Sequence, residues 1–229
     1  MASLLGLVAV PLLHAAPIVF SGFDNGANDT DPRPASNAAQ AAFSTAVGPT
    51  SLITFESAPL GSFSSLVVAP GVTMSSSSGE IRNSPLFTPD NVWGYNTTSG
   101  GKQFVSMLGG DLNFSFTTPI DAFGAFITGD QGPGVVGQET ITFNDGSSQT
   151  VNIPNTFMSD GGASFVGFFD PGKQIVGVQL HFLNDVVGVD DVQFQATPVP
   201  EPTSLAVFGV ALVGGVGCIW RWRRKPAVT

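Results

Sequence analysis

An alternation of apolar and polar residues with a period of two runs through the middle of the sequence from about Leu52 onward. Side chains of a strand point to opposite faces in turn, so this period indicates strands with one buried face. Clusters of Gly, Pro, Asn and Asp separate the alternating segments. The pattern predicts an all-β domain, an antiparallel β-sandwich of jelly-roll type, over residues 50–196. Its expected inward positions are Ile53, Phe55, Leu112, Phe114, Phe116, Ile141, Phe143, Val176, Val178, Leu180 and Phe182.

Three local signals refine this prediction. Residues 122–127 and 164–169 are apolar on both faces, so they should form central strands, with the other sheet on one side and a helix or loop on the other. The Asn-Asp-Gly-Ser sequence at 144–147 predicts a hairpin with a type I′ turn, because Asp-Gly tolerates positive φ angles. One short helix is expected in the body, with Ser36 as its N-cap and Gly48 at its end.

The segment before the predicted sandwich divides into two parts. Residues 1–16 contain an apolar stretch followed by Ala15 and Ala16, the outline of a secretory signal peptide without a basic start. A buried N-terminal strand is the alternative interpretation of the same residues. Residues 17–49 are expected to form a polar loop, over 21–34, and then the helix.

Residues 197–229 have the composition of a membrane anchor. The run 203–220 carries no charge and as a helix would span about 27 Å, at about 1.5 Å per residue. Basic residues stay on the cytoplasmic side of a membrane, so a cluster of them directly after the run should stop the helix with the body outside. The sequence therefore predicts a single transmembrane helix over 203–220, followed by the membrane stop Arg221, Arg223, Arg224 and Lys225.

A short motif, Pro200-Glu201-Pro202, stands directly before this run. The motif, the apolar run and the basic stop, in that order, resemble the PEP-CTERM sorting signal, a tail also labelled an ice-binding protein C-terminal domain. The resemblance implies that an exosortase, a membrane transpeptidase, recognises Pro200, Glu201 and Pro202 and processes the protein near them. It also implies export, with the membrane first and the cell surface or extracellular matrix as destination.

The distribution of charge argues against one class of partner. Only 11% of residues are charged, and before the tail four basic residues stand against nearly all of the 17 acidic residues. An acidic body without a basic patch repels phosphate backbones. We therefore expect no nucleic-acid partner.

The sequence offers little for imidazole or thiol chemistry. Cys218 lies in the apolar tail and His14 in the predicted signal peptide, while His181 alternates with buried strand positions and should point to solvent. Nucleophilic schemes with a histidine base, and zinc sites with three or four nitrogen or sulfur ligands, are therefore not expected. We expect no enzymatic activity. A glycosidase-like pair of carboxylates remains an alternative, because nothing in the spacing of the acids selects or excludes one.

Two acidic clusters are candidate calcium sites, since Ca²⁺ prefers oxygen ligands. Alternation with Val192 and Phe194 points Asp190 inward, and an inward carboxylate must be hydrogen-bonded or bound to a cation. Asp191 and Glu56, at the end of the first strand of the body, are its candidate partners. A second cluster comprises Asp24, Asp29 and Asp31. Turn capping and strand-end hydrogen bonding are the alternative explanation of both.

Trp93 and Tyr95 lie together in a polar, Gly-rich segment. Aromatic rings presented by a loop can stack on sugars, so this pair is a candidate carbohydrate-binding site; rings folded back onto the sandwich are the alternative. The leading functional hypothesis is an exported, non-catalytic surface or matrix protein with a structural or binding role, and polysaccharide is its expected partner beside the exosortase and the membrane. A lectin-like carbohydrate-binding module is the alternative.

Overall fold

A computed structural model describes residues 17–131, 137–154 and 161–196 of the chain. The predicted signal peptide at 1–16, and the sorting tail with its expected span at 203–220, lie outside these residues. Within the described ranges, no helix has both the length and the apolar character needed to cross a membrane.

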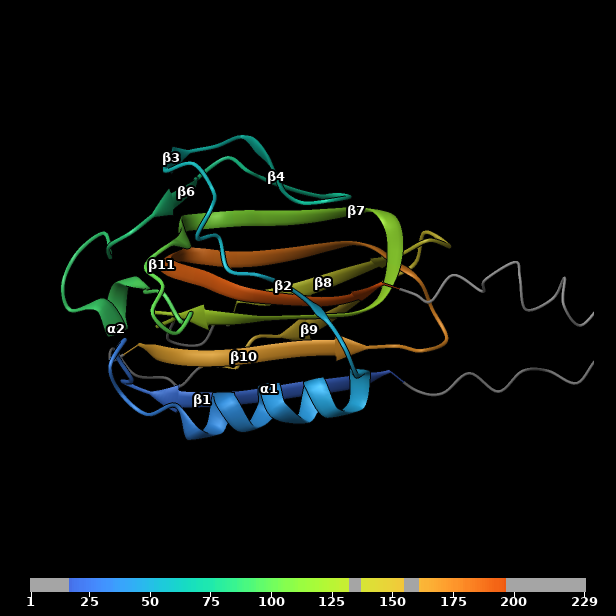
Figure 1. Ribbon diagram of the computed structural model, residues 1–229, viewed down its shortest axis with the longest axis horizontal. Helices are drawn as coiled ribbons and strands as arrows, with labels where there is room; N and C mark the ends of the chain where they lie inside the picture. Colours follow the sequence, from blue (N-terminus) through green and yellow to red (C-terminus); the bar gives the residue numbers. More distant parts are fainter. Residues whose placement is uncertain (1–16, 132–136, 155–160, 197–229) are drawn as a thin grey trace, which may run out of the picture. The chain divides into compact units, whose positions relative to one another are not determined.

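The described residues form a body that is mostly antiparallel β-sheet (Figure 1). The helices are α1 (Pro34–Val47) and α2 (Asp90–Trp93). The strands are β1 (Ile18–Asn25), β2 (Ser51–Ile53), β3 (Gly61–Ser62), β4 (Ser65–Ala69), β5 (Val72–Ser76), β6 (Gly79–Arg82), β7 (Phe104–Thr128), β8 (Gln138–Phe143), β9 (Ser148–Asn152), β10 (Gly162–Phe169) and β11 (Ile175–Ala196).

Two long strands, β7 and β11, hold the sheet together. The main path of the sheet is β1-β10-β7-β11-β8-β9, while β5 and β6 pair with the first half of β7 and β2 pairs with the end of β11. Ile175 and Ala196, the two ends of β11, both pair with Ile120 of β7, and Val189 pairs with two separate β7 residues. Both strands must therefore bend back, as Figure 1 shows for β7, and the sheet folds over itself into the predicted sandwich.

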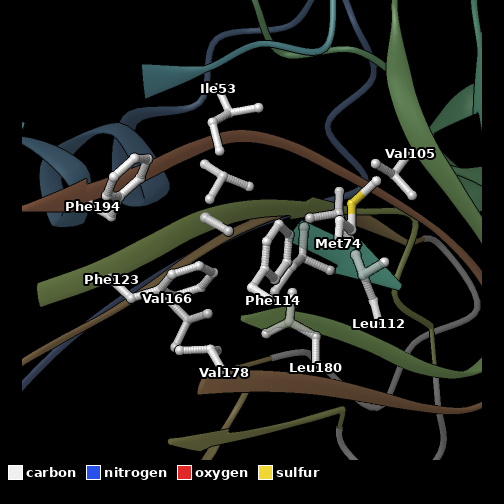
Figure 2. Close-up of a cluster of buried hydrophobic side chains, with 14 of the residues drawn as sticks. Ile53, Met74, Val105, Leu112, Phe114, Phe123, Val166, Val178, Leu180 and Phe194 are labelled. Carbon is white, nitrogen blue, oxygen red and sulfur yellow. The ribbon is translucent and has the colours of Figure 1, made fainter. Parts of the chain in front are cut away.

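The space between the two halves of the bent sheet is filled by one apolar core. Phe114 and Phe123, from the two arms of β7, pack against each other inside it, with their ring centroids 5.3 Å apart and their planes tilted by 53° (Figure 2). All but one of the predicted inward positions are buried. The exception is Val176, which is only partly buried while its neighbour Ile175 is fully buried. A bulge between Ile175 and Gly177 shifts the register there, which a strict period of two does not anticipate.

Helix α1 covers the outer face of β10 and of the second arm of β7. Phe43 of α1 is fully buried and packs against Phe165 of β10, with centroids 5.6 Å apart. Phe126 of β7 packs edge-on against the same Phe165 ring. This confirms that the segments 122–127 and 164–169, apolar on both faces, are central strands covered by the N-terminal helix.

The start of α1 differs from the prediction. Arg33, not Ser36, occupies the N-cap position, and its side chain makes no capping hydrogen bond. The carboxylate of Asp24, on β1, caps the helix instead. It accepts hydrogen bonds from the Ala35 and Ser36 amides, at 2.9 and 2.8 Å, and from the Ser36 hydroxyl at 2.7 Å. An acid at this point also suits the helix dipole. The predicted end at Gly48 is confirmed.

Three further expectations are corrected. Residues 21–25, expected in a loop, belong to β1, which pairs with β10 along its whole length. A second, short helix, α2, precedes the 94–103 segment. The 144–147 hairpin joins β8 to β9 as predicted, but of its residues only Gly146 has a positive φ, and its amide donates to the Phe143 carbonyl. That geometry is a type I turn followed by a glycine bulge, not a type I′ turn.

Glu139 of β8 is an unusual member of the core. Its side chain is fully buried, and neither carboxylate oxygen has a hydrogen-bond partner among the described residues. Burial raises the pKa of Glu139 to about 8, because removal from water disfavours the charged form. The folded protein therefore carries this side chain as a neutral acid near neutral pH.

This burial predicts a loss of stability as the pH rises. The unfolded chain releases the Glu139 proton near its ordinary pKa of 4.5, whereas the folded chain keeps it until about pH 8. The unfolded state thus binds fewer protons between these values, and the free energy of unfolding should fall there by several kcal/mol, at about 1.4 kcal/mol for each pKa unit.

Urea unfolding of the wild type and of Glu139→Gln, at about pH 5 and about pH 8, tests this. The variant keeps the side-chain shape but cannot ionise, so its free energy of unfolding should fall less over the same range. Glu80→Gln, which alters a partly exposed side chain paired with Arg82, is the control and should follow the wild type. Equal pH slopes for wild type and Glu139→Gln would contradict the prediction.

Candidate functional site

The connection from α2 to β7, residues 94–103, crosses one end of the sandwich and is called here the end loop. Its second residue is Tyr95, which is 1% exposed and whose hydroxyl donates to the Ala27 carbonyl at 2.8 Å. The Thr128 hydroxyl accepts from the Tyr95 amide at 2.8 Å and donates to the Tyr95 carbonyl at 2.9 Å. The loop is therefore tied to the end of β7 from its first residues.

A close backbone crossing places the loop against β11. Gly94 has a φ of 79°, and a Cβ atom there would lie 2.2 Å from the Gly188 nitrogen. Gly129, with a φ of 80°, would bring a Cβ within 2.4 Å of the Gly94 nitrogen. Only glycine fits both the backbone conformation and the space.

Asp190 of β11 anchors the middle of the end loop. Its side chain is fully buried and faces the end loop. The alternation that predicted its orientation does not continue through it, because Val189 lies in the same apolar core as Val192, with the positive φ of Asp191 between them. One carboxylate oxygen, Oδ2, accepts from the amides of Thr97 and Thr98 at 2.7 and 3.2 Å. Burial, and then the charge of Asp191, raise the pKa of Asp190 to about 7, while the hydrogen bonds from the loop amides act in the opposite direction.

Asp191 completes this anchor. Its φ of 47° is rare for a residue other than glycine, and it turns the Asp191 side chain towards the same loop. The Thr97 and Thr98 hydroxyls donate to the two Asp191 carboxylate oxygens, at 2.9 and 2.7 Å. Two adjacent carboxylates thus hold one Thr-Thr pair by its amides and its hydroxyls.

Glu56 holds the far end of the loop. Its Oε1 accepts from the amides of Lys102 and Gln103, each at 2.8 Å. The predicted calcium ligands Glu56, Asp190 and Asp191 therefore all bind the end loop, but at different points along it. No group of three or more His, Cys, Asp or Glu suited to hold a metal ion occurs in the part of the chain that the structure describes, so calcium at these acids stays a prediction.

The three acids of the N-terminal cluster, Asp24, Asp29 and Asp31, also make separate hydrogen bonds. Asp24 caps α1, and Asp31 accepts from the Asn28 amide at 3.1 Å. The Asp29 amide donates to Asp90 at 3.3 Å, and burial together with the Asp90 carboxyl raises the pKa of Asp29. Turn capping accounts for Asp24 and Asp31, and nothing gathers the three acids around one point.

The predicted sugar-stacking pair is not presented to solvent as a pair. Tyr95 is buried, so its ring cannot stack on a sugar, and that part of the prediction is wrong. Trp93 is partly buried and packs edge-on against Phe87, with centroids 5.0 Å apart. The Gly-rich composition suggested an open loop, but the hydrogen bond to Ala27 folds the Tyr95 ring inward.

His181 is placed on β11, with its side chain 38% exposed, in agreement with the strand pattern. Its Nδ1 lies 2.5 Å from an Asp111 carboxylate oxygen on the adjoining arm of β7. The sequence contained no signal for this partner, because the two residues meet only through the β7–β11 register.

A polar cleft of about 570 Å³ opens beside the end loop. It lies where the end loop meets residues 83–85, which follow β6, and the connection between β1 and α1. The cleft is lined mainly by polar side chains, with Tyr95 and Phe104 as its aromatic residues. Its charged and amide-bearing lining consists of Asp29, Arg33, Lys102, Asn83 and Asn96. These residues are scattered in the sequence and form no motif, so sequence reasoning missed the cleft.

The described body is thus a β-sandwich with a polar cleft at one end, and the tail adds a specific signal. The family described as PEP-CTERM protein-sorting motif matches residues 198–225, so the chain carries this motif. The match confirms the resemblance seen at Pro200-Glu201-Pro202, and such a motif implies export and sorting to the cell surface. It covers the tail alone.

Other comparisons are weak. No curated protein shows significant similarity to the chain. Among solved structures, TmCBM61 in complex with beta-1,4-galactotriose has 13% identity and a TM-score of 0.37, over 63% of this chain and 95% of that chain. The K2 cleaved adhesin domain of Lys-gingipain has 16% identity and a TM-score of 0.36, over 65% and 98%. A family 6 carbohydrate-binding module has 14% identity and a TM-score of 0.32, over 64% and 94%. Similarities this low do not indicate what this chain binds.

The anchoring of the end loop leads to a prediction for Asp190→Ala. The Thr97 and Thr98 amides would lose their acceptor. A hydrogen bond contributes about 0.5–1.5 kcal/mol to stability, and about 1.5–3 kcal/mol when the acceptor is charged. Hydrogen exchange followed by NMR should show these two amides exchanging at least about tenfold faster, through local opening of the loop.

Asp111→Ala is the matched control, because this carboxylate contacts the His181 side chain and none of the loop amides. It should leave both exchange rates unchanged. Unchanged rates in Asp190→Ala as well would show that Asp190 does not hold the loop.

Proposed function

We propose that this chain is an exported protein that an exosortase processes at Pro200-Glu201-Pro202. The β-sandwich then remains outside the cytoplasm, at the cell surface or in the extracellular matrix. The observation that carries the proposal is the PEP-CTERM motif at residues 198–225. Its support in the sequence is the uncharged run 203–220, followed by the basic stop that begins at Arg221.

We further propose that the body is not an enzyme and has a structural or binding role. The non-catalytic role is supported by the hydrogen bonds through which several of its acidic residues stabilise the fold. Asp190, Asp191 and Glu56 hold the end loop, and Asp24 caps α1. Groups engaged in this way are poorly placed to act as a general acid or a nucleophile, because their hydrogen bonds would have to break first.

A second candidate function is saccharide binding, with the cleft as its site in place of the Trp93 and Tyr95 pair. The cleft favours this because its lining combines amides, as in Asn83 and Asn96, with the exposed hydroxyls of Ser84 and Ser99. Such groups hydrogen-bond the hydroxyl groups of a sugar, and ligand sites are commonly concave with a few convergent polar groups. The end loop is held in place by Asp190 and Glu56, so its polar groups are positioned before a ligand arrives.

The sorting proposal is tested by replacing Pro200, Glu201 and Pro202 with alanine in a strain that contains an exosortase. Mass spectrometry of the mature protein should show a new C-terminus near the motif in the wild type and retention of residues up to Thr229 in the variant. Pro226→Ala lies just outside the matched region and should be processed like the wild type. Retention of Thr229 in both the wild type and the triple variant would contradict exosortase processing.

The saccharide proposal is tested with Asn83→Ala, which removes an exposed amide from the cleft. On a glycan array, binding should weaken about fivefold, as expected for one net hydrogen bond of about 1 kcal/mol. Asn37→Ala, on the exposed face of α1, is the control and should bind like the wild type. Equal binding by Asn83→Ala and wild type would remove the cleft as the site, and cleavage of the arrayed glycans would contradict a non-catalytic body.

A further inference from the structure

Only some of the basic residues of the body form ion pairs with acidic residues. Four basic residues precede the tail, and all four are among the described residues. Arg82 lies 2.8 Å from Glu80, and Lys173 lies 3.4 Å from Asp145, so these two form ion pairs. Arg33 and Lys102 form no ion pair with any described acid, although acidic residues far outnumber basic ones in the chain. Both of these unpaired cations line the polar cleft.

Arg33 is held in place by uncharged groups. Its Nη2 donates to the Thr97 carbonyl of the end loop at 3.2 Å, and its guanidinium carbon lies 5.5 Å from the centroid of the Phe126 ring. Its Nη1 is shut off from solvent and has no hydrogen-bond partner among the described residues. The guanidinium is therefore fixed on one side of the cleft with its charge uncompensated by a carboxylate.

Lys102 presents its charge differently. Its backbone amide is fixed by Glu56, while its side chain is exposed and lines the same cleft. Asp29 is the single acid among the residues that line the cleft, and it faces Asp90. Two cations and one acid thus line the cleft, while the nearby carboxylates of Glu56, Asp190 and Asp191 are engaged by the amides and hydroxyls of the end loop. Cations gathered in a concave site attract a small anion more strongly than scattered ones.

We propose that the cleft binds the carboxylate groups of an acidic polysaccharide, such as one built from uronic acids. This inference rests on the proposed saccharide binding and specifies the class of sugar. The exposed ammonium of Lys102 can pair directly with a carboxylate, and the fixed charge of Arg33 adds a second attraction. The amides and hydroxyls of the cleft would form hydrogen bonds with the hydroxyl groups of the same sugar. The acidic remainder of the body repels a polyanion, which directs such a chain to the cleft.

The probes for this inference are trigalacturonate and its fully methyl-esterified form, which has the same backbone without the charges. Isothermal titration calorimetry with the full-length wild-type protein should show trigalacturonate binding at least about tenfold more tightly than the ester. The difference should shrink as salt is raised to about 0.5 M, because ions screen exposed charges.

Lys102→Gln tests the site itself, since this exposed side chain makes no contact needed for folding among the described residues. It should weaken trigalacturonate binding about fivefold, as for one exposed charge pair, and leave binding of the ester unchanged. Arg33→Gln should weaken it further. Lys173→Gln removes a cation that is paired with Asp145 and lies outside the cleft, and it should bind trigalacturonate like the wild type.

The outcomes separate the two proposals. If neither the acid nor the ester binds, saccharide binding in the cleft is wrong. If both bind equally tightly, the cleft binds saccharides but the preference for acidic ones is overturned. If triglutamate binds as tightly as trigalacturonate, the ligand is an acidic peptide and the assignment to a polysaccharide is overturned. Loss of binding in Lys173→Gln equal to that in Lys102→Gln would show a general charge effect and overturn the cleft as the site.

Discussion

The pairing of β11 with both arms of β7 is the interaction on which the rest of this structure depends. It joins the two halves of the sandwich through the backbone of a single strand, and it brings Phe114 and Phe123 together in the core between them. It also places Asp190 and Asp191 at the end of the sandwich, where they reach the end loop. The polar cleft therefore depends on the same pairing that closes the core.

The second constraint is the burial of acidic groups, and the structure meets it in two ways. The Oδ2 atom of Asp190 accepts hydrogen bonds from the end loop, which offset part of its desolvation and also fix the loop, while its Oδ1 atom has no partner among the described residues. Glu139 has no such donors among the described residues, and protonation is then the less costly state. One acid thus orders a loop, whereas the other makes the core sensitive to pH.

Sequence reasoning anticipated the features that depend on side-chain alternation. The strands around Leu112, Ile141 and Leu180 follow from a period of two, because burial of one face is a local property of a strand. The segments that are apolar on both faces correctly indicated central strands covered on both sides, with a helix or a loop left open for the outer face. Val176 shows the limit of this reasoning, since a single bulge moves a side chain to the other face.

What the sequence did not reveal depends on contacts between distant segments. Residues 21–25 of β1 consist mostly of Gly and polar side chains, which is typical of a loop, and they form a strand because β10 pairs with β1 along its whole length. The cap of α1 is supplied by Asp24 from that strand, not by the local Ser36. Arg33 and Lys102 carry no motif, and only the folded chain places them beside one cleft. Tyr95 likewise looks exposed until the Ala27 carbonyl is brought within reach.

The position of β11 in the chain has a consequence for the order of assembly. It is the last strand of the body, ending at Ala196, and yet it pairs with β2, β7 and β8. The sorting motif begins at residue 198, directly after it. For a chain that crosses a membrane N-terminus first, β2, β7 and β8 must wait on the far side without this partner until the final strand emerges. Contacts between segments so far apart in sequence also form slowly. During translocation the body would therefore stay incompletely folded until the tail reaches the membrane. Folding would then be completed at nearly the same time as the sorting signal becomes accessible to the exosortase.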